Sequence, residues 1–222
     1  MKTEKELAAL AAVKFVKDGM VIGLGTGSTA YFAIKAVGAM VQNGLQIKAV
    51  PTSEATRQMA ETLQIPLIDI NEISAIDVTI DGADEFTENF ELIKGGGGAL
   101  LREKIVASLT NQQIIIADSS KKVEKLGKFK LPIEVIPFAY NYVLTQIDVF
   151  GGKGAIRMKG GERYITDQGN YIIDADFGLI DNPATLDKQL KQVTGIVEHG
   201  LFINLTHKII MGTGGTTVEY HR

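Results

Sequence analysis

Three segments of this chain combine glycines with charged or hydroxyl side chains. They are Gly25-Thr26-Gly27-Ser28-Thr29, residues 81–85 (DGADE) and residues 94–104 (KGGGGALLREK). Each follows a short apolar stretch, and the first and third also precede a helical pattern. Because the carboxyl ends of parallel strands share one edge of a sheet, we expect an anion-binding loop, carboxylates and a lysine to meet there. This combination suits chemistry on a small phosphorylated molecule.

The first segment joins an expected strand to an expected helix. Its glycines let backbone N–H groups approach a ligand, the helix N-terminus favours an anion, and Ser28 and Thr29 add hydroxyl donors. It does not match the dinucleotide-binding fingerprint G-x-G-x-x-G, because Ser28 stands where the third glycine would be. It is not a P-loop either, because it has no lysine. A glycine turn that only tightens packing is the alternative.

The second segment places Asp81 and Asp84 directly after an apolar strand pattern. Two carboxylates at this spacing can bind hydroxyl groups, and they can raise each other's pKa so that one becomes a proton donor. A Mg²⁺ site is a second interpretation, because Mg²⁺ prefers oxygen ligands. A simple capped turn is the third, since Asp and Gly are common turn residues.

The third segment sets Lys94 before four consecutive glycines. Four glycines carry a large entropic cost, which indicates that bare backbone is needed there, and amide groups beside an ammonium can hold an oxyanion. Glu103 follows on the next helix among apolar neighbours, where a carboxylate can serve as a general base. An ordinary surface charge is the alternative for Glu103. Lys121 follows another expected strand, where a basic residue could meet phosphate or a developing oxyanion, and a solvated lysine is the alternative.

Composition narrows the function further. The chain has 222 residues, a formal net charge of −3 and no cysteine. The charge argues against nucleic-acid binding, and the lack of cysteine excludes thiolate catalysis, disulfides and cysteine metal sites. No apolar stretch approaches the length of a membrane span, and the first residues form an amphipathic helical pattern. We therefore expect a cytoplasmic protein with a small-molecule partner, no nucleic acid and no membrane.

The first half alternates strand and helix patterns, which predicts an α/β fold with a parallel sheet and helices on both faces. The expected strands are 21–24, 47–50, 66–70, 77–80 and 113–117, and the expected helices are 7–16, 28–42, 53–63 and 99–109.

The second half differs in pattern and predicts a smaller, ferredoxin-like α+β domain in the order β-α-β-β-α-β. Its expected strands are 133–136, 155–158, 163–166, 171–174 and 196–197, with helices at 140–147 and 183–193. The turn at 167–170 indicates a hairpin between two of these strands. Segments 201–205 and 208–211 are expected to return to the first sheet. The expected domains are therefore 1–127 with 201–222, a Rossmann-like catalytic domain, and 128–200, for oligomerisation.

Taken together, these motifs resemble the type A family of ribose-5-phosphate isomerase. The resemblance rests on GLGTGSTA at 23–30, DGADE at 81–85, KGGGGALLREK at 94–104, IADSSK at 116–121 and LPIEVIP at 131–137. It extends over nearly the whole chain and is most typical in the first 140 residues.

The resemblance implies cofactor-free and metal-free interconversion of D-ribose 5-phosphate and D-ribulose 5-phosphate in the non-oxidative pentose phosphate pathway, by a homodimer or homotetramer. It implies that Glu103 is the proton acceptor, and we expect Asp81 to assist ring opening, with Asp84 and Lys94 handling oxygen protons and charge. The substrate-binding residues that it implies are Thr26, Gly27, Ser28, Thr29, Asp81, Gly82, Ala83, Asp84, Lys94, Gly95, Gly96, Gly97 and Lys121. Lys5 matches a lysine that some members use near the phosphate.

Related sugar-phosphate enzymes are rivals. An amino-sugar-phosphate deaminase would need a histidine near the site, and the first histidine here is His199. A coenzyme A transferase would need a nucleophilic glutamate and a groove for its cofactor. A non-catalytic sugar-phosphate sensor would keep the anion loop without the base.

Overall fold

The computed structural model describes residues 2–222, which form two compact units. Unit 1 contains the described residues up to Ala83 together with Arg102–Lys122 and Leu205–Arg222. Unit 2 contains Asp84–Leu101 and Val123–Asn204. These divisions differ from the expected boundaries at 127 and 201, chiefly because residues 84–101 belong to unit 2.

Unit 1 is built on a six-stranded sheet in the order β15-β14-β6-β3-β1-β2. All neighbouring strands are parallel except β14 and β15, so the expected parallel α/β sheet is confirmed. The strands are β1 (Val21–Leu24), β2 (Lys48–Pro51), β3 (Ile76–Gly82), β6 (Thr110–Asp118), β14 (Lys208–Thr213) and β15 (Thr216–His221). The helices that accompany them are α1 (Glu4–Ala12), η1 (Val13–Phe15), α2 (Ala30–Gln42), α3 (Glu54–Thr62), η2 (Ile70–Glu72), α4 (Leu100–Ser108) and η3 (Ser119–Lys121).

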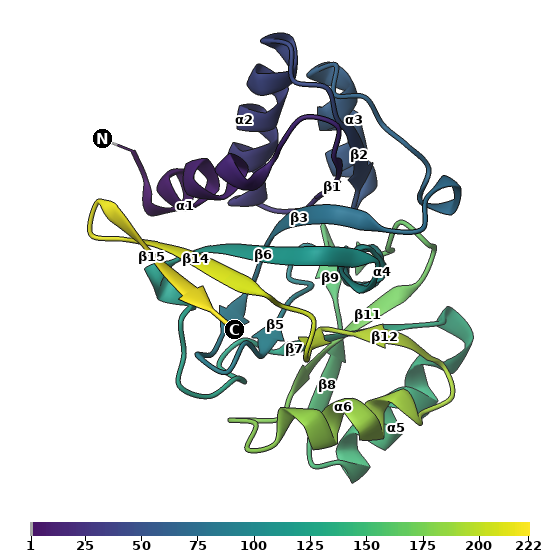
Figure 1. The fold of residues 1–222 in the computed structure, drawn as a ribbon. Coiled ribbons are helices and arrows are strands. Elements are labelled where there is room, and N and C mark those ends of the chain that lie inside the picture. Colours follow the sequence, from purple (N-terminus) through teal and green to yellow (C-terminus); the bar gives the residue numbers. More distant parts are fainter. Residues whose placement is uncertain (1) are drawn as a thin grey trace. The chain divides into compact units, whose positions relative to one another are not determined.

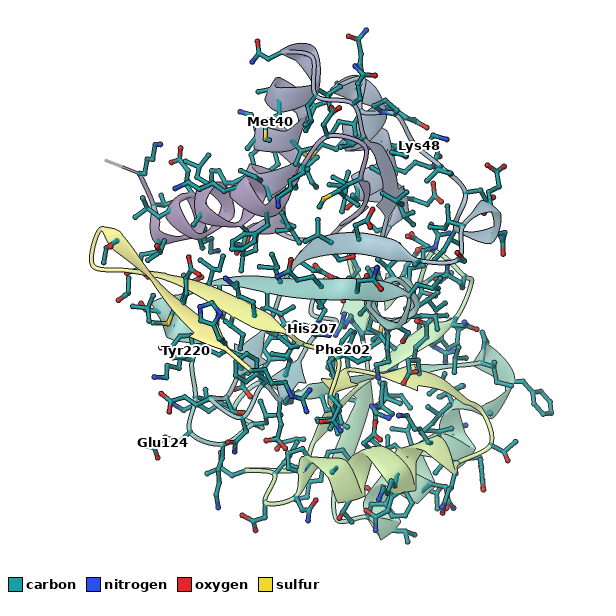
Figure 2. The ribbon with its side chains drawn as sticks, viewed as in Figure 1. Met40, Lys48, Glu124, Phe202, His207 and Tyr220 are labelled. Atoms are coloured by element: carbon teal, nitrogen blue, oxygen red, sulfur yellow. The ribbon has the colours of Figure 1, made fainter. Side chains whose placement is uncertain are left out.

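The main core of unit 1 lies between the sheet and the helices α1 and α2 (Figure 1). Alanines on α1 allow this helix to approach the sheet closely, and Ile34 and Val37 of α2 pack against strand residues such as Ile80. Met40 of α2 belongs to the rim of the same core (Figure 2). Helix α4 contributes Val106 to a smaller apolar cluster. Burial of apolar area in these clusters stabilises the helices on which candidate site residues lie.

Unit 2 contains a four-stranded antiparallel sheet in the order β12-β7-β11-β8. Along the chain the order is β7-α5-β8-β11-α6-β12, which confirms the ferredoxin-like arrangement. These elements are β7 (Leu131–Val135), η4 (Pro137–Ala139), α5 (Tyr140–Val149), β8 (Lys153–Ile156), β11 (Tyr171–Asp176), α6 (Pro183–Lys191) and β12 (Ile196–His199). Helices α5 and α6 lie on one side of this sheet and share its core (Figure 1).

Two small sheets complete unit 2. One joins β13 (Leu201–Phe202), β5 (Leu92–Ile93) and β4 (Glu85–Phe86), and the other pairs β9 (Met158–Lys159) with β10 (Glu162–Arg163). Across residues 2–222, no helix has both the length and the apolar character needed to cross a bilayer.

Three expectations about strands are wrong. Residues 66–70 do not form a strand, because only Leu67 bridges to β2 and the chain then turns into η2. The segment 201–205 pairs with β5 of unit 2 and does not return to the first sheet. Arg163 pairs with Met158, so the hairpin expected between 163–166 and 171–174 shrinks to one bridge between Ile165 and Tyr171.

Glu134 on β7 is a carboxyl group inside unit 2. Its Oε1 accepts hydrogen bonds from Thr166 Oγ1 at 2.8 Å and from Asn170 Nδ2 at 2.9 Å. Burial raises the pKa of Glu134 because desolvation disfavours the charged form, and these two hydrogen bonds oppose the rise only in part. The ionised form of Glu134 therefore lowers the free energy of unfolding. The protonated form avoids this loss, so the stability is fully present below the unfolded pKa of Glu134 and is lost as the pH rises through its folded pKa.

We predict that Glu134→Gln stabilises the protein at neutral pH. Glutamine retains an acceptor for Thr166 and Asn170 without a buried charge, so the melting temperature should rise by about 2–4 °C, equivalent to roughly 1 kcal/mol. The gain should shrink as the pH falls toward the ordinary glutamate pKa, as measured by thermal unfolding at several pH values. Exposed Glu124 (Figure 2) provides the control Glu124→Gln, which should show no such pH-dependent gain. A Glu134→Gln protein that is less stable than the parent at neutral pH would contradict this account.

Candidate active site

The loop between β1 and α2 is shaped by a close approach of two strands. A Cβ atom on Gly25 would lie 2.2 Å from Asp81 Oδ1, and one on Gly23 would lie 2.1 Å from Thr79 Oγ1. Gly27 has a φ of +111°, a conformation that favours glycine. Close packing therefore explains Gly23 and Gly25, while backbone conformation explains Gly27.

Thr26 fastens this loop to the rest of unit 1. Its N–H donates to Asp81 Oδ1 at 3.0 Å. Its Oγ1 lies 2.7 Å from Thr52 Oγ1, 3.2 Å from Thr56 Oγ1, and donates to Ser53 Oγ at 2.9 Å. The Thr26 hydroxyl is thus engaged inside the protein and holds the loop.

The hydroxyl groups of residues 52, 53 and 56 belong to the site and were not identified from the sequence, where 53 and 56 were only part of the expected helix 53–63. Thr52 Oγ1 donates to the carbonyl oxygen of Leu24 at 3.0 Å, and Thr56 Oγ1 donates to that of Gly25 at 2.9 Å. All three residues are buried. The signal in the sequence that could have identified these three residues was their position directly after β2, the strand beside β1 in the sheet.

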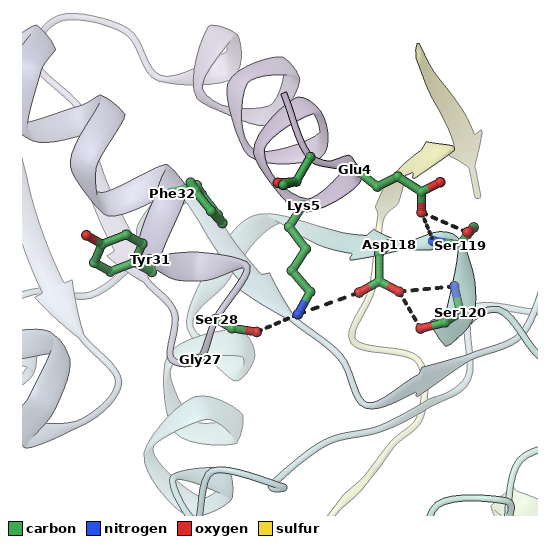
Figure 3. Close-up of a pocket in the computed structure, with 10 residues that line it drawn as sticks. Glu4, Lys5, Gly27, Ser28, Tyr31, Phe32, Asp118, Ser119 and Ser120 are labelled. Carbon is green, nitrogen blue, oxygen red and sulfur yellow. Dashed lines mark hydrogen bonds and ion pairs between the residues drawn. The ribbon is translucent and has the colours of Figure 1, made fainter. Parts of the chain in front are cut away.

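Ser28 lines a pocket of about 870 Å³ in unit 1 (Figure 3). Lys5 of α1 donates from Nζ to Ser28 Oγ at 2.9 Å, and the same nitrogen lies 3.9 Å from Asp118 Oδ2. The pocket is lined by Thr3, Glu4, Lys5, Gly27, Ser28, Tyr31, Phe32, Asp118, Ser119 and Ser120. A lysine, hydroxyl groups and the N-terminal side of α2 thus line one cavity, which suits an anion.

The other side of this pocket is fixed by Glu4. Its carboxylate accepts hydrogen bonds from Ser119 N at 3.0 Å, from Ser119 Oγ at 2.7 Å and from Gly214 N at 3.2 Å. The hydrogen bond from the Ser119 amide lowers the pKa of Glu4 most, so this carboxylate favours its charged form. Neither Thr29, which is buried, nor Lys121, which is half-buried in η3, lines the pocket.

Asp81 is the penultimate residue of β3 and is buried. Its Oδ1 accepts a hydrogen bond from Gly82 N at 2.7 Å in addition to the one from Thr26 N. Two backbone donors on one oxygen fix the orientation of the carboxylate. Gly82 and Ala83 continue the chain toward Asp84, the first residue of unit 2.

Glu103 lies on α4 within unit 1, and only 5% of its surface is exposed. The alternative of an ordinary surface charge is therefore wrong. Its neighbour Arg102 donates from Nη1 to Glu54 Oε1 at 2.8 Å, which lowers the pKa of Glu54. Lys104 is also buried and not solvated. The Arg102–Glu54 pair connects α4 to the first residue of α3.

In unit 2, Asp84 meets the glycine segment. Asp84 Oδ2 accepts a hydrogen bond from Gly96 N at 2.7 Å, and a Cβ atom on Gly96 would lie 2.6 Å from the carboxylate. Gly98 N donates to the carbonyl oxygen of Gly95 at 3.0 Å, which closes a turn with φ of +100° and +84° at these two glycines. The tip of the turn, Gly96 and Gly97, is exposed.

Lys94 begins this turn and is buried. Its N–H donates to the carbonyl oxygen of Gly200 at 2.9 Å, and its ammonium lies 5.3 Å from the ring centroid of Phe202, labelled in Figure 2. A cation against an aromatic face is favourable, and burial keeps this charge in a medium of low dielectric constant.

Each unit thus presents part of the expected chemistry. Unit 1 supplies the anion pocket, Asp81 and Glu103, while unit 2 supplies Asp84, Lys94 and the exposed amides of the glycine turn. Within residues 2–222, no cluster of three or more histidine, aspartate or glutamate side chains has the arrangement of a metal site.

Known proteins resemble the chain over its whole length. The model of the family described as ribose 5-phosphate isomerase A (phosphoriboisomerase A) matches residues 48–215. Ribose-5-phosphate isomerase A of Bacillus mycoides is 52% identical over 221 residues, covering 99% of this chain and 100% of the relative. That of Streptococcus gordonii is 50% identical over 220 residues and covers 98% of both chains.

Solved structures agree with this similarity. A D-ribose-5-phosphate isomerase in complex with phospho-erythronic acid has a TM-score of 0.96 and 39% identity, with 100% of each chain covered. Ribose 5-phosphate isomerase A from Methanocaldococcus jannaschii has a TM-score of 0.94 and 41% identity, with 98% of each chain covered.

We predict that Gly25→Ala destabilises unit 1, because the new methyl group would overlap the Asp81 carboxylate. Overpacking of this kind costs about 1–3 kcal/mol, so the melting temperature should fall by several degrees. Gly82→Ala is the matched control, since its Cβ would meet its nearest atom at 3.8 Å and the change should stay within about 0.5 kcal/mol. Equal stability of Gly25→Ala and the parent would contradict the proposed close approach.

Proposed function

The chain belongs to the ribose 5-phosphate isomerase A family, and from this we propose that it interconverts D-ribose 5-phosphate and D-ribulose 5-phosphate. The reaction is a step of the non-oxidative pentose phosphate pathway. The observation that carries the proposal on the structural side is the burial of Glu103, a carboxylate on a helix of the unit that also holds the anion pocket.

The exchange of aldose and ketose moves one proton between C2 and C1 and another between the two oxygens, through an enediolate. We assign the carbon-bound proton to Glu103, whose burial removes the competition of bulk water for its carboxylate. Asp81 is assigned to ring opening, since its Oδ1 is fixed by two N–H groups and the orientation of the carboxylate is therefore defined.

The oxygen atoms of the substrate are assigned to groups of unit 2. Lys94 supplies positive charge, and Asp84, held by the amide of Gly96, exchanges protons with O1 and O2. The exposed amide of Gly97 offers a hydrogen bond to the developing oxyanion, while that of Gly96 holds Asp84. Stabilisation of an oxyanion by such donors is usually the largest electrostatic contribution to catalysis.

The phosphate group is assigned to the loop from Thr26 to Thr29 and the pocket beside it. Ser28 and Lys5 supply donors, and Thr26 supports the loop from below by its engaged hydroxyl. We assign Gly82 and Ala83 to backbone contacts with the sugar. Lys121, which follows the pocket residue Ser120 in η3, is assigned a supporting positive charge outside the pocket lining. The chain uses no cofactor in this mechanism, because every proton transfer has a side chain assigned to it.

We predict that Glu103→Gln keeps its affinity for inorganic phosphate but lowers kcat for ribose 5-phosphate by about 10²–10⁴-fold. The assay follows ketose formation and deuterium incorporation by EDTA-treated protein in D₂O. Exposed Glu61, which pairs with Arg57, gives the control Glu61→Gln with unchanged kcat. Near-normal turnover in Glu103→Gln would refute the assignment, and a parent that binds phosphate without isomerising the sugar would support a non-catalytic sensor.

We also propose that the protein acts in the cytoplasm, where the charge of sugar phosphates retains them, and that it forms a homodimer or homotetramer through unit 2. The support for self-association is an exposed apolar surface around η4. Phe138 is 98% exposed, Ile165 is 62% exposed, and the rings of Tyr140 and Tyr171 meet edge to face between their segments, with centroids 6.0 Å apart. Exposed apolar surfaces of this kind mark contact sites between proteins.

We predict that Phe138→Ser weakens self-association, so that its molar mass in light scattering falls at concentrations where the parent is oligomeric. Val149 at the far end of α5 is 70% exposed and gives the matched control Val149→Ser, which should keep the parental mass. The proposal fails if the parent is monomeric or if Phe138→Ser associates as strongly as the parent.

A further inference from the structure

The glycine turn of unit 2 is held from outside by two side chains that sequence motifs did not single out. Arg157, between β8 and β9, donates from Nη1 to the carbonyl oxygens of Gly95 at 2.9 Å and Gly96 at 3.1 Å. Tyr164, directly after β10, donates from its hydroxyl to the carbonyl oxygen of Gly97 at 3.3 Å. Three consecutive carbonyl groups are therefore engaged from one side.

Arg157 is itself immobilised. Its Nε donates to Asp174 Oδ2 at 2.9 Å, and its Nη2 donates to Asp174 Oδ1, so the pair is bidentate. A bidentate arginine–carboxylate pair defines the orientation of the guanidinium group as well as its position. The Tyr164 ring lies 5.9 Å from Arg157 Cζ, and Tyr164 N donates to the Arg157 carbonyl at 2.9 Å, which connects the two side chains into one support.

The glycines fit this support closely. A Cβ atom on Gly98 would lie 2.2 Å from the Tyr164 hydroxyl oxygen, and one on Gly95 would lie 2.8 Å from Leu100. A side chain at Gly98 would push the turn away from Tyr164, and one at Gly95 would overlap Leu100. The run of glycines therefore serves a close approach of backbone to side chain, in addition to the turn conformation.

Peptide geometry connects the support to the exposed tip. In a trans peptide the C=O and N–H groups point in opposite directions, so carbonyls held toward Arg157 direct the amides of Gly96 and Gly97 the other way. The Gly96 amide meets Asp84 Oδ2 in that direction, at 2.7 Å. A guanidinium charge on the carbonyl oxygens also polarises these peptides, which makes their N–H groups stronger donors.

We propose that Arg157, fixed by Asp174, and Tyr164 are positioning residues for the isomerisation. Arg157 orients and polarises the Gly97 amide, which stabilises the enediolate oxyanion, and the Gly96 amide, which fixes Asp84. Tyr164 holds the Gly97 carbonyl and thereby the turn in which both amides lie. The proposal rests on the isomerase function proposed above. Unit 2 is then part of the catalytic apparatus. The positioning residues act on stabilisation of the enediolate intermediate and not on binding of the phosphate group.

The test compares Arg157→Met, Arg157→Lys and Tyr164→Phe with the parent. We expect kcat for ribose 5-phosphate to fall by about 10–100-fold in Arg157→Met, less than for loss of a direct oxyanion donor, while KM changes less than about threefold. Arg157→Lys, which keeps a charged donor, should recover part of kcat, and Tyr164→Phe should show a smaller loss. Lys125→Gln, which removes an exposed ion pair with Asp181 in the same unit, is the matched control and should behave as the parent.

A binding measurement separates this role from general damage to the fold. The probe is phospho-erythronic acid, whose carboxylate carries charge where the enediolate would, with inorganic phosphate as the second probe. Arg157→Met should lose affinity for the acid by about the factor lost in kcat and keep its affinity for phosphate. Equal losses for both probes, or unchanged kcat and acid binding, would overturn the proposal.

The two proposals fail in different ways. If the parent does not isomerise the sugar, the proposed function is wrong, and the difference in acid binding between parent and Arg157→Met still decides whether Arg157 orients the anion-binding amides. If the parent isomerises and Arg157→Met matches it in both kcat and acid binding, only the positioning role is wrong. A parent without affinity for the acid overturns the positioning role directly.

Discussion

One carboxylate oxygen organises the anion-binding part of unit 1. Asp81 Oδ1 accepts the N–H groups of Thr26 and Gly82, one from the loop after β1 and one from the end of β3. This arrangement requires β1 to approach β3 so closely that no side chain fits at Gly25. The buried hydroxyls of Thr52 and Thr56 then hold the loop carbonyls. A buried carboxylate needs such partners, so the loop and Asp81 stabilise each other.

In unit 2 the segment that must be held in place is the glycine turn. This turn contains no side chain that could hold the backbone in place, and four flexible residues would otherwise lose much conformational entropy on ordering. Arg157 and Tyr164 supply the missing contacts from a neighbouring hairpin. In both units a segment free of bulky side chains is thus fixed by polar groups elsewhere in the chain, and its own N–H groups are left for a carboxylate or a ligand.

Local patterns were sufficient to predict the elements that carry the site. The alternation of apolar strands and amphipathic helices identified the parallel sheet, and the helix pattern after the glycines placed Glu103 on α4. The ferredoxin-like order of unit 2 also followed from its strands and helices. Such patterns arise from burial on one face of an element, which a sequence records residue by residue.

Long-range pairing was not predictable in the same way. β4, β5 and β13 are two residues long and show no periodicity, so their sheet and the transfer of residues 84–101 to unit 2 could not be recognised. Thr52 and Arg157 acquire their roles only through contacts with distant backbone carbonyls. An arginine that binds a carbonyl has the same local sequence signature as one exposed to solvent, and only the three-dimensional structure distinguishes them.

In the proposed reaction one buried helical carboxylate moves hydrogen between adjacent carbons of a sugar phosphate. The most direct measurement is a crystal structure of the protein with the open-chain sugar bound. We expect a carboxylate oxygen of Glu103 at about 3–3.5 Å from both C1 and C2, the distance of reacting atoms in a near-attack geometry. A well-defined sugar with its first two carbons far outside contact of Glu103, or with another side chain in that place, would contradict it.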